Sequence, residues 1–378
     1  MRAGSISPGT GTGLHRAPEW CSPYKHLPGA ETVGGDGEAR SLKRGSRPLR
    51  VAAFTAGIAS PSARFRVRQY ISRLADHEIV VNERWPKSGA FPPRTQALRP
   101  AWLIATLVQR VPHLISAWDA DVVVLQREMV STLPTLEGFT RCPRLVDIDD
   151  AIHLYRRGWA ARRLAGLADL VVVGNSWLAE IWQQWGGAVE VLPTPVDTER
   201  YVVTPFPERP TIGWIGSSGN LPYLENIAPA LSTVIRRFPG STIAVCCDRK
   251  PTFFDVPIHY VPWSEESEAA FLSSISVGVM PLSDGPWERG KCSFKMLQYM
   301  AAGRPCVVSP VGMNRELLSQ AELGLPARTN DEWVNALSEL IADPDLRELM
   351  GCAGRCVAAR FSVNALAPRF AELLHSLA

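Results

Sequence analysis

Residues 275–317 read ISVGVMPL, SDGPWERGKCSFKMLQYMAAGRP and CVVSPVGMNREL in succession, and this stretch decides the fold. An apolar strand leads into a loop with Gly and Pro, then into a helix, and then into a second strand that ends before Pro310 and Gly312. A strand, a helix and a strand in this order form the unit of a parallel α/β sheet. Ligands of such sheets lie beyond the carboxyl ends of strands and at helix N-termini. The stretch therefore predicts an α/β fold with a ligand site after its first strand.

The helix predicted in this stretch carries two lysines and a glutamine. Lys291, Lys295 and Gln298 recur at positions i, i+4 and i+7, so we expect them to share one helix face. A lysine in the first turn opposes the helix dipole unless an anion lies there too. The spacing therefore indicates a diphosphate site, and a solvated helix face is the alternative.

Strands and helices alternate along the rest of the chain in two successive sets. An apolar strand at residues 49–55 begins the first set, and one at residues 211–215 begins the second. Residues 193–210, which are rich in Pro and Thr, predict the connection between the two sets. Two sets of this kind predict two Rossmann-like domains.

Composition is that of a soluble globular protein, with 46% hydrophobic and 20% charged residues in a chain of 378. A net charge of +3 gives no argument for binding nucleic acid. The 8 cysteines include no Cys-x-x-Cys pair, which favours reduced thiols and a cytoplasmic protein. Neither a metal ion nor a cofactor is expected.

Two segments raise the question of targeting or membrane contact. Residues 1–48 are rich in Gly, Ser, Pro and Arg, which predicts a disordered extension or a misassigned start rather than a signal peptide. The apolar stretch 101–118 contains Arg110, Pro112 and His113 and is too polar to span a membrane. We expect a core helix broken at Pro112, with contact to a membrane surface as the alternative.

The run Asp147-Ile-Asp-Asp-Ala-Ile-His153 follows an apolar strand. Three carboxylates within four residues are costly to hold together unless a cation, hydroxyl groups or raised pKa values accommodate them. Strand ends of α/β sheets carry groups that act on ligands. Two alternatives stay open: Asp150 caps the next turn while Asp147 pairs with an arginine, or Asp147 and Asp149 hold a metal ion.

Two further groups are weaker candidates. The segment Gly213-Trp-Ile-Gly-Ser-Ser-Gly-Asn220 lies between a strand and a helix, so its amides are placed to meet a phosphate, although a plain turn is the alternative. It lacks the Gly-x-Gly-x-x-Gly fingerprint of nicotinamide-binding proteins. Arginines in the first helix and beside the Asp run face either a ligand or solvent. They are Arg64, Arg66, Arg156, Arg157, Arg162 and Arg163.

The stretch around the predicted helix resembles the donor-binding region of GT-B glycosyltransferases of the retaining family-4 (group 1) type. Met300-Ala-Ala-Gly-Arg-Pro305, Gly312 and Glu316 match the pattern of that family. The family has two glutamates flanking the helix start, where this chain has Gly290 and Gln298. Weaker similarity extends over nearly all of residues 49–378.

The resemblance implies a GT-B architecture, with two Rossmann-like domains facing a cleft and a C-terminal helix that crosses back to the first domain. The expected bounds are an acceptor domain at 49–205, a nucleotide-sugar domain at 206–362 and the returning helix at 363–378. It further implies a glycosyltransferase, hexosyltransferase-like and retaining, that acts in polysaccharide biosynthesis in the cytoplasm or at a membrane. A catalytically silent nucleotide-sugar-binding or scaffold protein is the alternative.

The implied partners are a nucleotide diphosphate sugar donor and a glycan or lipid-linked acceptor. In the family the strand before the Asp run commonly ends in His-Asp, so Asp149 stands in place of that His and Asp150 matches the Asp. The catalytic residues expected on this basis are Asp149, Asp150 and Lys295. The donor-binding residues expected are Gly216, Ser217, Ser218, Asn220, Lys291, Lys295, Gln298, Gly312 and Glu316. The acceptor-side residues expected are Arg64, Arg66, Asp147 and His153.

Overall fold

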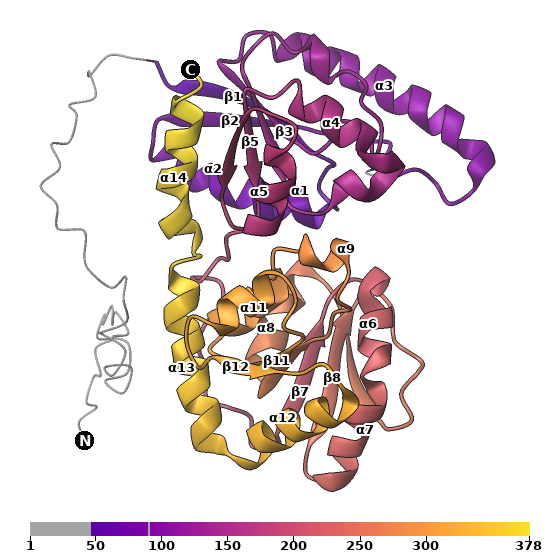
Figure 1. Ribbon diagram of the computed structural model, residues 1–378, viewed down its shortest axis with the longest axis vertical. Helices are drawn as coiled ribbons and strands as arrows, with labels where there is room; N and C mark the ends of the chain where they lie inside the picture. The colour runs from indigo at the N-terminus through magenta and orange to yellow at the C-terminus, as the bar shows by residue number, and fades with distance from the viewer. Residues whose placement is uncertain (1–46, 90) are drawn as a thin grey trace, which may run out of the picture. The chain divides into compact units, whose positions relative to one another are not determined.

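The computed structural model describes residues 47–89 and 91–378. The extension expected over residues 1–48 lies almost wholly outside the described residues. Two parallel sheets, each flanked by helices, make up the described chain (Figure 1). Among the described residues, we find no helix that combines the length and the apolar character needed to cross a membrane.

The first sheet contains six parallel strands in the order β2-β1-β3-β4-β5-β6. Its central strands are buried along their whole length, because helices cover both faces of the sheet. The strands are β1 (Leu49–Phe54), β2 (Ile79–Arg84), β3 (Val122–Gln126), β4 (Arg144–Ile148), β5 (Leu170–Val173) and β6 (Ala188–Val191). Their helices are α1 (Pro61–Arg66), α2 (Ile71–Ala75), α3 (Arg99–Ser116), α4 (Trp159–Ala165) and α5 (Ser176–Gln183).

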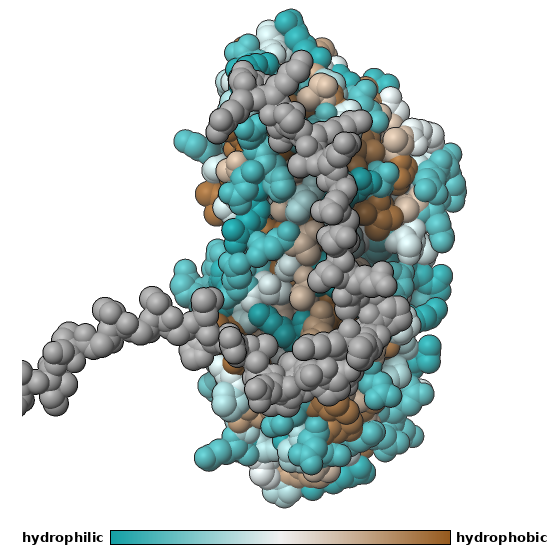
Figure 2. Space-filling view, turned by 90° about the vertical axis from the view of Figure 1, so that its left-hand side faces the viewer, coloured by the Kyte–Doolittle hydropathy of each residue, from teal (hydrophilic) through white to brown (hydrophobic). Residues whose placement is uncertain are grey.

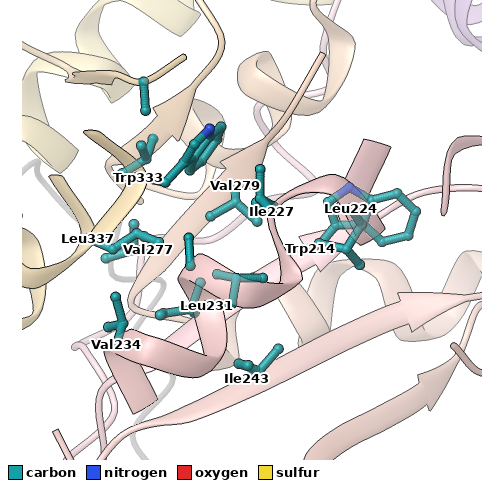
Figure 3. Packing of buried hydrophobic residues seen from close by; sticks show 14 of the residues in the cluster. Trp214, Leu224, Ile227, Leu231, Val234, Ile243, Val277, Val279, Trp333 and Leu337 are labelled. Atoms are coloured by element: carbon teal, nitrogen blue, oxygen red, sulfur yellow. The ribbon is translucent and has the colours of Figure 1, made fainter. Parts of the chain in front are cut away.

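The second sheet also has six parallel strands, in the order β12-β11-β10-β7-β8-β9. The strands are β7 (Thr211–Ile215), β8 (Thr242–Cys247), β9 (Ile258–Pro262), β10 (Val277–Met280), β11 (Cys306–Val308) and β12 (Gly324–Pro326). The helices are α6 (Leu221–Asn226), α7 (Ala228–Arg237), α8 (Glu265–Ser274), α9 (Pro286–Arg289), α10 (Phe294–Ala301), α11 (Met313–Leu318), α12 (Asn330–Ala342) and α13 (Pro344–Ala359). Figure 3 shows its core, in which Trp214 and Trp333 pack with aliphatic residues of β7, β10, α7 and α12.

The last helix, α14 (Val363–His375), packs against the first sheet rather than the second. Phe370 lies in the core of β1 and β3, and its ring centroid is 4.9 Å from that of Tyr70. The chain crosses between the two sheets at residues 193–210 and again before α14, and Val196 forms a parallel β-bridge with Ser362 where these crossings meet. The predicted α/β fold with two Rossmann-like domains and a returning C-terminal helix is therefore confirmed.

One sequence-based expectation about the fold is wrong. Helix α3 continues through Pro112 and is not a core helix, because only Thr106, Arg110 and Leu114 are buried. Pro112 is tolerated because proline removes a single backbone hydrogen bond, and the tertiary contacts of Arg110 hold the helix against the sheet.

Candidate active site

The carboxyl end of β4 lies against the loop between α9 and α10. The Cys292 thiol donates a hydrogen bond to the Asp149 carbonyl oxygen at 3.1 Å, and the Asn175 side chain donates to the Lys291 carbonyl at 3.1 Å. A Cβ atom at Gly290 would lie 2.8 Å from the Cβ of Ala151 and 2.9 Å from its nitrogen. The first domain's Asp run and the second domain's lysines therefore belong to one site.

Arg127 holds the two outer carboxylates of the Asp run. Its Nε donates to Asp149 Oδ1 at 2.7 Å, its guanidinium also pairs with Asp150, and it reaches the Ser62 hydroxyl at 3.0 Å. Sequence reasoning missed Arg127, although it follows β3, the strand next to β4. A basic residue just after a neighbouring strand is the signal that could have found it.

The shared arginine gives the two carboxylates different acidities. Burial alone would raise the pKa of Asp149, but the Arg127 charge and a hydrogen bond from Ser62 bring it below its usual range. Burial and the negative charge of Asp149 raise the pKa of Asp150, and Arg127 and Lys291 only partly offset this. Asp150 is therefore the better proton acceptor of the pair.

Asp147 pairs with Arg66 in the interior, as one half of an alternative for the Asp run anticipated, whereas the Asp150 side chain pairs with Arg127 instead of capping the next turn. The Arg66 Nε lies 3.1 Å from both Asp147 oxygens, and its Nη1 donates to the Leu192 carbonyl at 2.7 Å. The two side chains are 1% and 3% exposed. This burial favours a supporting role for both residues, which were expected on the acceptor side.

Lys295 lies on α10 with its side chain against the loop that follows β7. Its Nζ is 6.0 Å from the centre of the Trp214 ring, and a Cβ atom at Gly216 would lie 2.7 Å from its Cε. Burial and the charge of Lys291 lower the pKa of Lys295 to about 8. The ammonium is therefore poorly compensated, which is the environment that an anionic ligand improves.

Lys291 does not lie on α10, contrary to the expected helical spacing. The helix starts at Phe294, because Ser293 adopts a left-handed conformation with φ of 50°. The Lys291 Nζ lies 5.5 Å from the centre of the Trp287 ring. Its charge nevertheless lowers the pKa of Lys295, so the two lysines act on the same region.

Other groups of the protein already accept the hydrogen bonds that the loop after β7 can donate. The Ser218 amide and hydroxyl donate to the Asp248 carboxylate at 2.6 and 2.7 Å. The Asn220 side chain donates to the Ser217 hydroxyl at 3.0 Å. A phosphate at this loop would compete with Asp248 for the Ser218 donors.

Gln298 and Arg64 belong to one chain of side-chain hydrogen bonds. Gln298 is buried and donates to the Tyr201 hydroxyl at 2.9 Å, and Tyr201 donates to Glu268 at 2.7 Å. Arg64 completes the chain from the first domain, with its Nη2 3.0 Å from Glu268. Both residues were expected to face substrates, whereas the structure engages them in a connection between α1, α8 and α10.

Three of the expected residues remain, namely Gly312, Glu316 and His153. Gly312 precedes α11, and Glu316 on that helix accepts a hydrogen bond from the Ser176 hydroxyl at 2.8 Å. His153 lies with its ring centre 5.5 Å from that of Trp177, and burial lowers its pKa, so it is neutral at pH 7. A neutral imidazole leaves the charge of the site to the carboxylates, the lysines and Arg127.

Two residues of the site were not singled out from the sequence. The Tyr223 hydroxyl donates to Glu288, and burial together with the Glu288 and Asp150 charges raises the Tyr223 pKa. Glu288 lies two residues before Gly290, the position of a family glutamate. Within the described residues, no group of three or more His, Cys, Asp or Glu side chains is arranged to hold a metal ion.

Residues 248–343 match the family model described as "Glycosyl transferases group 1". This stretch, called the group 1 segment, is similar to group 1 glycosyltransferases. That segment spans β10, α10 and β11 and contains Lys291, Lys295, Gln298, Gly312 and Glu316. The resemblance stated from the sequence is thereby confirmed. No curated protein matches the chain.

Solved structures of glycosyltransferases share the fold at low sequence identity. Sucrose-phosphate synthase from Thermosynechococcus elongatus has a TM-score of 0.68 and 15% identity, covering 87% of this chain and 99% of that one. HepE from Anabaena, solved with UDP and glucose, has a TM-score of 0.63 and 15% identity, covering 87% and 100%. WaaG, a glycosyltransferase of lipopolysaccharide biosynthesis, has a TM-score of 0.63 and 14% identity, covering 86% and 99%. The GT-B fold is thus confirmed for this chain.

Proposed function

We propose that this chain is a glycosyltransferase that moves a sugar from a nucleotide diphosphate sugar to a glycan or lipid-linked acceptor. The observation that carries the proposal is the apposition of two kinds of charge. Across the junction of the two sheets, the charge of Lys291 lowers the pKa of Asp150, and the charge of Asp150 raises the pKa of Lys295. The group 1 segment supports the same assignment.

The second domain is proposed to hold the donor. Lys295 and Lys291 would neutralise the diphosphate, and the backbone of the loop at Gly216 would lie beside it. Although the Lys295 pKa is lowered to about 8, the side chain is mostly protonated at neutral pH, and a bound diphosphate would raise that pKa. Gln298 is assigned a supporting role in this site, because its side chain is committed to Tyr201.

The first domain is proposed to hold the acceptor. In the reaction, the bond between the anomeric carbon and the diphosphate oxygen breaks, and a bond from the acceptor hydroxyl oxygen to that carbon forms. The lysines stabilise the charge that develops on the departing diphosphate. Asp150, with its raised pKa, accepts the hydroxyl proton, while Arg127 orients both carboxylates.

Several finer points belong to the proposal. Retention of anomeric configuration, which requires the acceptor hydroxyl to attack on the face from which the diphosphate departs, and a hexosyl donor are proposed from the group 1 resemblance. UDP-glucose is the first donor to test, because HepE is solved in complex with it. The division into an acceptor domain at 49–205, a donor domain at 206–362 and a returning helix at 363–378 is proposed together with a cytoplasmic location and contact with a membrane surface.

The test combines binding with turnover on the full chain. Thermal unfolding is measured with a panel of nucleotide sugars, because a ligand that binds the native state raises the melting temperature. Release of nucleoside diphosphate is then followed with the best donor and a mixture of glycan and lipid acceptors. Stabilisation without release would leave the silent binding protein, and the absence of stabilisation by every nucleotide sugar would reject the proposal.

A further inference from the structure

Helix α3 carries a row of exposed apolar side chains on the face turned away from the first sheet. This apolar stripe consists of Ile104, Val108, Val111 and Ile115, which are 62%, 65%, 46% and 53% exposed. Their spacing of four, three and four residues places them on one side of the helix. A row of four exposed apolar residues is typical of a surface that binds another protein or a membrane.

Arg110 fixes the direction in which the stripe points. Its guanidinium donates to the Thr55 carbonyl at 2.8 Å and to the Met129 carbonyl at 3.1 Å. Arg110 lies with Thr106 and Leu114 on the buried face of α3, opposite the stripe. The exposed row is therefore a stable feature of the fold rather than a loose end of a helix.

The stripe continues onto an aromatic edge at the C-terminal end of α3. Trp118 donates from its indole nitrogen to the Phe139 carbonyl at 3.3 Å, and the Arg141 guanidinium lies 3.7 Å from the Trp118 ring centre. Phe139 and Trp159 are 66% and 56% exposed, and they border a cavity of about 530 Å³ together with Arg163. Aromatic rings beside arginines are the side chains that proteins place at the level of lipid headgroups.

The sequence segment that contains α3 carries basic residues and lacks acidic ones. From Trp85 to Trp118 the sequence contains neither Asp nor Glu, while Lys87, Arg94 and Arg99 are exposed there. The first acidic residue is Asp119, just beyond the end of the helix. Figure 1 places α3 at the outside of the helices beside the first sheet. Figure 2 shows another side of the molecule, on which hydrophilic residues alternate with hydrophobic patches where described residues are visible.

We propose that the apolar stripe and the aromatic edge bind an anionic lipid surface, with Lys87, Arg94 and Arg99 over the headgroups. An apolar row flanked by basic residues is the composition of helices that lie in the membrane interface. A second copy of the chain is the competing occupant, and the experiment below separates the two. The proposal rests on the membrane contact named in the proposed function, but the stripe is separate from the lysines and carboxylates of the candidate active site, so vesicle binding and turnover test the two independently.

Vesicle sedimentation with the full chain tests the proposal. We expect binding to vesicles of phosphatidylcholine with phosphatidylglycerol, and weaker binding to phosphatidylcholine alone. Arg94→Gln with Arg99→Gln should lower the partition coefficient by roughly 25-fold, since each basic residue near an anionic surface contributes about fivefold. Ile104→Ser with Val108→Ser should lower it by about tenfold or more.

The matched control is Leu349→Ser with Lys250→Gln, which removes an exposed apolar residue and an exposed charge from the second domain. This control should bind vesicles as the unchanged chain does, and all variants should keep its melting temperature, because the replaced side chains are exposed. Equal binding by the stripe variant and the control would overturn the proposal. The proposal would also be wrong if the chain binds no vesicles and forms a dimer that the stripe variant converts to a monomer. In that case a second copy covers the stripe.

Discussion

The two sides of the candidate active site treat their charges differently. Asp147 and Asp149 each face an arginine of the first domain, and Asp150 shares Arg127 with Asp149. In the described part of the chain, neither Lys291 nor Lys295 forms an ion pair, and both lie near tryptophan rings instead. One side, called here the neutralised side, therefore has most of the charge of its three carboxylates balanced by two arginines, while the other retains positive charge for which a ligand can supply the partner.

The largest effect is expected when Asp150, the proposed base on the neutralised side, is replaced. Asp150→Asn should lower kcat by about 10²–10⁴, the usual contribution of general acid–base catalysis. Donor affinity should not fall, because the change removes a negative charge near Lys291 and Lys295 rather than a group that binds the diphosphate. Steady-state kinetics with isothermal titration of the nucleotide diphosphate measures both quantities, and Asp149→Asn serves as the comparison. An equal loss of nucleotide affinity would place Asp150 in the donor site.

The second effect concerns the stability of the neutralised side. Arg66→Met should lower the free energy of unfolding by about 3–5 kcal/mol, because it leaves the Asp147 carboxylate buried without its partner. Arg369→Met is the matched control, because its pair with Glu190 is 48% and 43% exposed and should contribute at most about 1 kcal/mol. Urea unfolding measures the difference. Similar losses in both variants would show that burial of the pair does not matter.

The third effect tests the uncompensated side. Lys295→Ala should lower kcat by about 10² or more and raise KM less, because the ammonium stabilises charge that grows as the glycosidic bond breaks. Lys295→Arg should not restore the rate fully, since a planar guanidinium does not occupy the place of an ammonium. Lys250→Ala, at an exposed lysine of the same domain, is the control. Near-normal kinetics in Lys295→Ala would show that Lys295 does not stabilise the departing diphosphate.

The smallest effect is a pH dependence of donor binding. The free protein loses the Lys295 proton at a pKa of about 8, whereas a bound diphosphate favours the protonated form and raises that pKa. Affinity for the nucleotide diphosphate should therefore be constant below pH 8 and fall above it, by at most about tenfold per pH unit. Titrations from pH 6 to 9.5 test this. Lys295→Arg should remove the change near pH 8, and its persistence in that variant would assign it to another group.

The sequence predicted what depends on local pattern, and it failed where a role depends on neighbours distant in the chain. Strand ends, and with them the place of Asp149, Asp150 and Lys295, follow from apolar runs. Arg127 acquires its role only because β3 pairs with β4, which brings Gln126 opposite Asp147. The helical spacing of Lys291 failed because Ser293 leaves the helical conformation, which hydrophobic periodicity does not reveal.

The sequence also did not reveal which polar side chains are bound by other residues of the protein. Gln298 and Arg64 have the types and positions of ligand-binding residues, yet Tyr201 and Glu268 bind them. Tyr201 comes from the connection between the domains, whose path the sequence does not specify. Helix α3 shows the reverse case, since its apolar residues predicted a core helix and its apolar stripe is exposed.

The contact between Gly290 and Ala151 constrains how this chain can evolve. Every other amino acid adds a Cβ atom, which at Gly290 would meet the Ala151 backbone nitrogen at 2.9 Å. The family glutamate therefore cannot return by a single mutation, because Gly290→Glu would force the two domains apart before its carboxylate could act. A larger residue at position 290 therefore fits only if Ala151 shifts first. Sequence drift should consequently be slower at position 290 than at the exposed residues beside it.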